Sequence, residues 1–135
     1  QILNLLRELQ ADLSLAYLFI THDLNLVRYL ADRGGVMYLG RLVETAAAGD
    51  LFEEPLHPYA KALISANPVP DPTLPLTPQV LEGEVPSPLD PPSGCPFHPR
   101  CPRAFDRCPV EVPKLLPQPG RSAPRQVACH LYDED

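Results

Sequence analysis

The chain has 135 residues, of which 44% are hydrophobic, and its formal net charge is −6. This length supports one modest core, and the negative charge excludes a broad electrostatic surface for nucleic acid or for an anionic membrane. No apolar run reaches the roughly 20 residues that a membrane-spanning helix needs.

The prolines divide the sequence into two halves of different physical character. None of the 19 prolines precedes Pro55.

The sequence begins at Gln1 rather than at Met, within a helical pattern, and no charged-then-apolar leader opens it. We therefore expect a fragment of a longer protein, without an indication of secretion.

The first half predicts an alternation of helices and strands. Residues 1–13 place apolar side chains at helical intervals, which predicts an amphipathic helix in need of a packing partner. Residues 15–21 (LAYLFIT) lack alternation, as a parallel strand covered on both faces does. A second helix is expected over residues 22–32, with Asp23 in its first turn. This rhythm is typical of an open α/β sheet.

A hairpin and two short helices are expected next. Short strands at Val36–Leu39 and Leu42–Thr45 would be joined by a tight turn at Gly40 and Arg41. The residues before Pro55 predict a short helix that this proline stops.

The prolines that follow set the limits of the next elements. Another helix is expected to begin near Pro58 and to be closed by Pro68. From residue 68 the sequence predicts an extended, proline-rich connector with one possible strand at Val80–Val85.

His22 directly follows the predicted strand. In open α/β sheets, ligands bind beyond the carboxyl ends of the strands, and a neutral imidazole can hold a water molecule or a phosphate oxygen. From spacing alone, a histidine that caps the following helix or bonds a nearby carbonyl is the simpler interpretation.

The stretch AYLFITHDLNLVRYLADRGGVMYLGRLVE resembles the part of ABC-transporter ATPases that contains the switch histidine. In that family a strand ends in a Thr-His-Asp-Leu turn, and a helix, a Met-Tyr-x-Gly strand and an x-Val-Glu strand follow. The resemblance covers residues 1 to about 55. It implies that His22 contacts the γ-phosphate of ATP and helps to position water.

ATP and Mg²⁺ binding in that family need further motifs. The sequence contains no phosphate loop, no signature motif and no strand-end Asp-Glu pair. We therefore expect that this chain alone neither binds nor hydrolyses ATP.

The stretch EEPLHPYAKALISANP resembles the start of the C-terminal extension found in the ATPase subunits of oligopeptide and dipeptide importers. His57, Pro58 and Tyr59 match the tripeptide that names this extension. A structural interpretation is sufficient for all three, because Pro58 suits the first turn of a helix and Tyr59 its inner face.

The last third holds all four cysteines, in the pattern C-x5-C-x6-C-x20-C: Cys95, Cys101, Cys108 and Cys129. The first three precede a proline, which favours extended backbone geometry at the cysteine and lets several sulfurs face one centre. Interleaved arginines favour thiolates over thiols.

Three kinds of site compete for these cysteines. Two disulfides would need an oxidising compartment. A structural zinc site usually has cysteine pairs two to four residues apart, although His98 and His130 could join here. A cubane iron–sulfur cluster suits four thiolates at wider spacing. Residue chemistry alone leaves the cluster only slightly ahead of zinc.

The resemblance decides between these alternatives. The importer extension carries a pattern matching CPFHPRCPRAFDRC…ACHLY, and members of that group are associated with a 4Fe–4S cluster. This implies that all four cysteines are ligands. We favour a structural staple over a redox or iron sensor, because this third is short of apolar residues.

The predicted fold class is α/β, a fragment of a P-loop NTPase sheet with flanking helices, followed by a Pro/Cys-rich irregular metal-binding extension. Residues 1–55 would complete a nucleotide-binding domain, and residues 56–135 would form the extension. The resemblance implies the ATP-hydrolysing subunit of a peptide importer that uses ATP and Mg²⁺. Family breadth extends the solutes to nickel and other small molecules.

The implied partners are transmembrane permease subunits and a second ATPase subunit, with no nucleic acid. The subunit would lie peripherally on the cytoplasmic face of the inner membrane. The alternative is a stand-alone, metal-stapled interaction module without catalysis, which would need residues 1–55 to form a stable core by themselves.

Overall fold

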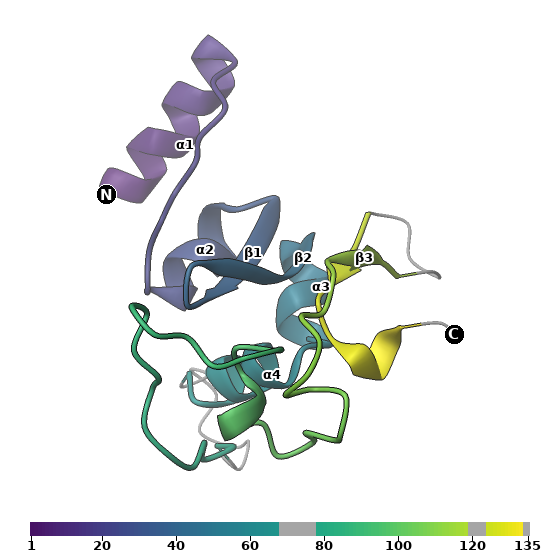
Figure 1. The fold of residues 1–135 in the computed structure, drawn as a ribbon. Coiled ribbons are helices and arrows are strands. Elements are labelled where there is room, and N and C mark those ends of the chain that lie inside the picture. Colours follow the sequence, from purple (N-terminus) through teal and green to yellow (C-terminus); the bar gives the residue numbers. More distant parts are fainter. Residues whose placement is uncertain (68–77, 119–123, 134–135) are drawn as a thin grey trace.

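The computed structural model describes residues 1–67, 78–118 and 124–133 (Figure 1). Its elements in chain order are α1 (Ile2–Leu13), α2 (Leu24–Leu30), β1 (Arg33–Tyr38), β2 (Arg41–Ala47), α3 (Ala48–Glu53), α4 (Pro58–Ser65), the 3₁₀ turn η1 (His98–Arg100), β3 (Leu116–Pro117), β4 (Gln126–Val127) and the 3₁₀ turn η2 (His130–Tyr132).

The sheet joins the two halves of the chain. Its strand order is β1-β2-β4-β3, and each neighbouring pair is antiparallel. In β2, Glu44 and Thr45 pair with Val127 and Gln126 of β4. The mixed α/β class is therefore confirmed, whereas the described sheet is a small antiparallel one rather than part of a parallel NTPase sheet.

The strand predicted at residues 15–21 does not form. This segment has no regular secondary structure, and Leu18 and Ile20 are 90% and 95% exposed. A strand from the middle of a parallel sheet needs hydrogen-bonding neighbours on both sides, and none of the described strands pairs with it. The prediction from the apolar run was therefore wrong for this chain.

The first helix is confirmed, and it packs on little. α1 contains no buried residue, and Ile2 is 75% exposed. Figure 1 shows α1 standing apart from the sheet and from α4. The apolar face that predicted a packing partner thus remains open to solvent.

The hairpin is confirmed with its turn one residue earlier than predicted. Tyr38 pairs with Arg41, which makes Leu39 and Gly40 the two turn residues. Their φ angles are 45° and 76°, and two positive values in succession are typical of a type I′ turn, whose twist matches that of the flanking strands.

The two later helices are also confirmed, and the late strand is not. α3 ends before Pro55, and α4 has Pro58 at its start. Pro68 lies outside the described residues. Val80–Val85 forms no strand, since it is flanked by prolines that cannot donate to a ladder.

An aromatic cluster links the hairpin, α4 and the cysteine-rich loop. The rings of Tyr38 and Tyr59 have centroids 4.7 Å apart, and Phe97 lies 5.2 Å from Tyr38 and 5.4 Å from Tyr59. Phe97 and Tyr38 are buried.

Among the described residues, no helix has both the length and the hydropathy that crossing a membrane requires.

Candidate functional site

The cysteine loop is compact and held by its own backbone. The Cys95 N–H donates to the Cys108 carbonyl at 2.8 Å, the Cys101 N–H to the His98 carbonyl at 3.2 Å, and the Cys108 N–H to the Phe105 carbonyl at 2.9 Å. These turns bring the first three cysteines of the pattern into one loop. Cys129 follows β4 and begins the turn η2.

All four cysteines are free thiols that influence one another. Cys95 and Cys108 are buried, and Cys101 and Cys129 are half-buried. Burial raises the pKa of the Cys129 thiol to about 11, and the charges of Cys101, Cys95 and Cys108 raise it further. Burial likewise raises the pKa of Cys95 and Cys101.

Backbone amides already point at three of these sulfurs. Cys95 accepts a hydrogen bond from the Phe97 N–H, Cys101 from the Arg103 N–H, and Cys129 from the Leu131 N–H. Each donor lies two residues after its cysteine; after Cys95 and Cys101 the intervening proline has no N–H. Each N–H lowers the pKa of its thiol and so offsets part of the rise that burial causes, although the pKa of all three thiols stays raised.

The loop is not arranged for a single metal ion. Across residues 1–67, 78–118 and 124–133, no group of three or more His, Cys, Asp or Glu side chains is placed to hold one ion. The predicted metal-binding extension is therefore present as an irregular cysteine-rich loop, without a metal-ion site among the described residues.

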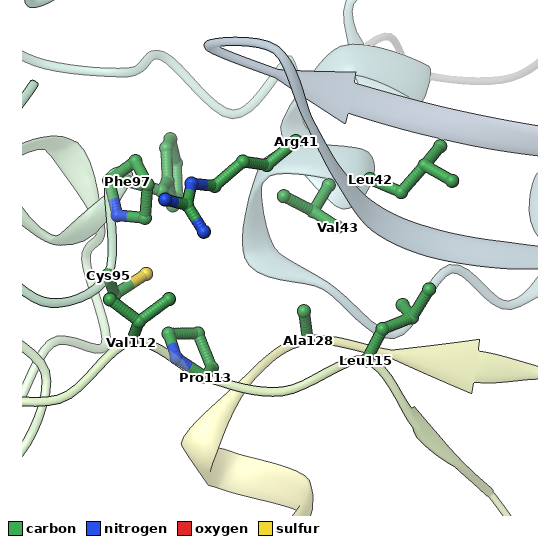
Figure 2. A pocket seen from close by; sticks show the side chains of 10 residues that line it. Arg41, Leu42, Val43, Cys95, Phe97, Val112, Pro113, Leu115 and Ala128 are labelled. Carbon is green, nitrogen blue, oxygen red and sulfur yellow. The ribbon is translucent and has the colours of Figure 1, made fainter.

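A pocket of about 180 Å³ lies beside the loop. It is lined by the end of the hairpin, including Arg41 and Val43, by Cys95 and Phe97, and by the segment around Val112. Figure 2 shows the Cys95 sulfur turned toward this pocket. One of the four sulfurs thus faces this pocket.

Gly94 allows the close approach of the two ends of the cysteine loop. Its φ is 66°, and a Cβ at this position would overlap the Cys108 carbonyl oxygen and lie 2.5 Å from the Pro109 carbonyl carbon. Gly40 is a matched comparison, since its φ is 76° and a Cβ there would meet nothing within 4 Å.

We expect Gly94→Ala to cost clearly more stability than Gly40→Ala. The backbone penalty of about 1–2 kcal/mol applies to both changes, but only Gly94→Ala also forces apart Cys95 and Cys108. Urea unfolding followed by circular dichroism measures both costs. Equal losses would show that the close contact at Gly94 has no energetic weight.

A buried ion pair fastens the tripeptide segment to the sheet. Arg125 Nη2 donates to Glu44 Oε1 at 2.7 Å, and the two side chains are 3% and 0% exposed. The Glu44 carboxylate also accepts the N–H groups of Leu56 at 3.0 Å and His57 at 2.8 Å. Arg125 Nη2 donates as well to the Glu54 carbonyl. Glu44 thus joins β2, the start of α4 and the C-terminal segment.

His57 is structural, as the sequence predicted. Its Nδ1 accepts the Tyr59 N–H at 3.0 Å and so caps α4, and its ring lies 5.6 Å from that of Phe97. The residue is 1% exposed, and burial lowers the pKa of His57 to about 4. The buried ring is therefore neutral and carries its proton on Nε2.

The buried His57 predicts a loss of stability in mild acid. Below its ordinary pKa of 6.5 the unfolded chain takes up a proton that the folded chain refuses until about pH 4. The free energy of unfolding should therefore fall by about 3 kcal/mol over this window. His57→Asn keeps a capping oxygen without this titration. Identical pH profiles for both proteins, measured by urea unfolding, would contradict the prediction.

His22 lies apart from the cysteine loop in the sequence and is exposed at the start of α2. It is not the cap of this helix. Asp23 is, since its Oδ1 accepts the N–H groups of Asn25 at 2.9 Å and Leu26 at 3.3 Å. The capping interpretation of His22 is therefore wrong, and its imidazole is left accessible to a ligand.

Two important residues escaped prediction. Glu44 was noticed only as part of the x-Val-Glu pattern, and Arg125 was not singled out. A glutamate inside an apolar strand is a signal, because a carboxylate on a buried face needs a cationic partner. The sequence gives no indication that this partner lies 81 residues away.

Comparisons with known proteins agree with these motifs. Residues 43–108 match the family model described as "Oligopeptide/dipeptide transporter, C-terminal region". The chain is 56% identical over 131 residues to the "Probable peptide ABC transporter ATP-binding protein y4tS" of Sinorhizobium fredii, a match that covers 97% of this chain and 36% of the relative.

A second relative, the di/tripeptide transport ATP-binding protein DppF of Pseudomonas aeruginosa, is 52% identical over 138 residues. That match covers 99% of this chain and 40% of the relative. The chain thus spans well under half the length of these relatives. It corresponds to the C-terminal region of oligopeptide/dipeptide ABC-transporter ATP-binding proteins.

Proposed function

We propose that this chain serves in the ATP-hydrolysing subunit of a peptide importer. The observation that carries the proposal is the 56% identity, over 97% of the chain, to a protein named as a peptide ABC transporter ATP-binding protein. In the intact subunit, ATP and Mg²⁺ would be held by motifs outside this chain, and His22 would contact the γ-phosphate. Permease subunits and a second ATPase subunit would be its partners at the cytoplasmic face of the inner membrane.

The open N-terminal part supports this proposal over a stand-alone module. α1 contains no buried residue, and residues 15–21 form no strand although their composition suits a covered one. Residues 1–55 would then complete a nucleotide-binding domain, with residues 56–135 as the extension. A stand-alone module would instead need a buried core within the first segment.

The test is ATP-dependent peptide uptake by vesicles containing the whole transporter. His22→Ala should lower uptake and ATP hydrolysis on the order of 100-fold, the usual scale for losing a group that positions or activates a nucleophile. Asp12→Asn, an exposed change on α1, serves as the control. The 135-residue chain alone should show no ATP hydrolysis. Activity of the isolated chain, or full uptake with His22→Ala, would refute the assignment.

We also propose that the four cysteines hold a 4Fe–4S cluster. The chemistry of the donor set supports the proposal, because all four cysteines are free thiols, three of them on one hydrogen-bonded loop and the fourth at the start of η2. Four thiolates around one zinc ion would stand roughly 3.8 Å apart, from Zn–S bonds of about 2.3 Å. A cubane cluster separates its thiolates more widely than a single zinc ion does.

The role that this site supports is a staple. When bound, the cluster would supply four metal–sulfur bonds between the loop and the segment after β4. Binding would require the thiols to release their protons; burial raises the cost of that release, and the backbone amides at Cys95, Cys101 and Cys129 offset part of it. Zinc remains the alternative metal, and metal analysis separates the two.

A further inference from the structure

Cys129 needs a positioning device that the other three cysteines do not. Cys95, Cys101 and Cys108 share one hydrogen-bonded loop, whereas Cys129 is separated from Cys108 by 20 residues. Its own turn, η2, is short, with the Tyr132 N–H donating to the Cys129 carbonyl at 3.0 Å. This turn fixes Cys129 locally, and the Ala128 N–H, which donates to the Val43 carbonyl at 2.8 Å, ties the preceding residue to the hairpin rather than to the cysteine loop.

The next residue, His130, makes that connection. Its side chain is 1% exposed. Nε2 lies 2.9 Å from the Glu111 carbonyl oxygen, three residues after Cys108, and Nδ1 lies 2.8 Å from Asp133 Oδ2. Both partners are acceptors, so the ring lies within hydrogen-bond distance of the loop on one side and of the end of η2 on the other; donating to both at once requires a proton on each ring nitrogen.

Arg107 closes the network from the loop side. Its Nη1 lies 3.2 Å from Asp133 Oδ2, the same oxygen that His130 contacts. Its Nε and Nη2 donate to the two carboxylate oxygens of Glu111 at 2.8 and 3.1 Å. The Phe105 ring also packs edge-on against His130, with centroids 6.4 Å apart.

The network therefore spans the neighbours of two cysteines. Arg107 precedes Cys108 and His130 follows Cys129, and Asp133 contacts both network residues. Its ion pairs are partly exposed and add little to stability by themselves. Their geometric effect is larger, because each of the two cysteines is adjacent to a residue whose side chain direction is fixed.

We propose that His130, Asp133 and Arg107 position Cys129 against Cys108 so that the fourth thiolate completes the cluster site. This inference rests on the proposed cluster, which gives the positioning its function. The position of Cys129 relative to Cys108 can nevertheless be measured without metal. These are positioning residues, since none of them is assigned as a ligand.

The first arm of the test measures position in the metal-free chain. In a Cys95→Ser, Cys101→Ser background, a short bis-maleimide should cross-link Cys108 to Cys129 within one chain. Asp133→Ala should lower the cross-linking yield severalfold, and Asp133→Asn, which keeps an acceptor oxygen, should restore most of it. Asp106→Ala is the matched control, because it removes the same charge from an exposed position on the same loop. An unchanged yield with Asp133→Ala would overturn the positioning role.

The second arm measures the cluster in the full chain with all four cysteines, reconstituted anaerobically with ferrous iron and sulfide. Asp133→Ala and His130→Ala should lose the visible absorption to a chelator about 10–100-fold faster than the unaltered chain, the usual effect of removing groups that orient metal ligands. Circular dichroism of the metal-free variants establishes that they fold. If His130→Ala does not fold, the rate of absorption loss is compared between Asp133→Ala and Asp133→Asn instead. Equal loss rates would overturn the inference. An unaltered chain that binds no iron, while cross-linking still depends on Asp133, would refute the cluster and leave the positioning role standing.

Discussion

Replacing Cys101 by serine is expected to abolish the visible absorption of the anaerobically purified chain and to lower the hydrogen-exchange protection of its C-terminal third without unfolding it. This third buries few apolar side chains, chiefly Phe97 and Val127, so metal–sulfur bonds would supply much of its stability. Zinc-finger peptides, which gain about 10–16 kcal/mol of folding free energy from their metal, are unfolded without it. We expect a smaller loss here, because the β2–β4 pairing and the hydrogen bonds of the cysteine loop also hold this third.

Iron content, the visible spectrum and amide hydrogen exchange measure this outcome. The chain has no fifth cysteine that could serve as a control substitution. The control is therefore removal of the metal from the unaltered protein with a chelator, which should reproduce the effect of Cys101→Ser. Zinc without iron in the purified protein would remove the cluster proposal. A metal-free chain that keeps full exchange protection over residues 94–118 would remove the staple.

Replacing Glu44 by alanine is expected to destabilise the chain by about 3–5 kcal/mol, because removing one partner of a buried ion pair leaves the other charge uncompensated. Here the change strands the Arg125 guanidinium, and it also leaves the N–H groups of Leu56 and His57 without their acceptor. Typical domains have only 5–15 kcal/mol of stability in total, so the loss should be visible as a large shift of the urea midpoint.

The matched control is Glu84→Gln, which removes the same charge from an exposed position and should leave the midpoint unchanged. A double variant, Glu44→Gln with Arg125→Met, should lose less than the sum of the two single changes, because it removes both buried charges together. Strict additivity of the two changes would show that the pair is not energetically coupled.

The local elements of this fold could be predicted from sequence because their signals are local. The hairpin was recognised from its turn residues, and α4 from Pro58. The turn was misplaced by one residue because Leu39 adopts a positive φ, which a bulky side chain rarely does. The strand predicted at residues 15–21 does not form because its signal depends on distant partners. An apolar run indicates a strand that is covered on both faces, but the neighbouring strands and covering helices have to come from elsewhere in the protein.

The long-range features could not be predicted in the same way. The pairing of β2 with β4 depends on two residues of Gln126–Val127, too short for any periodic signal. The convergence of the four cysteines on one metal centre was expected from their pattern and stays a prediction. The residues that surround Cys129 were not predicted, because His130 and Asp133 gain their meaning only from the position of Arg107.

The shared edge of β2 also has a consequence for how the chain assembles. Glu44 and Arg125 are 81 residues apart, and closing a flexible loop of that length costs roughly 4 kcal/mol of chain entropy. Contacts of such long sequence separation form slowly. We therefore expect the hairpin and α4 to be in place first, with the C-terminal tail the last segment to dock and the first to detach.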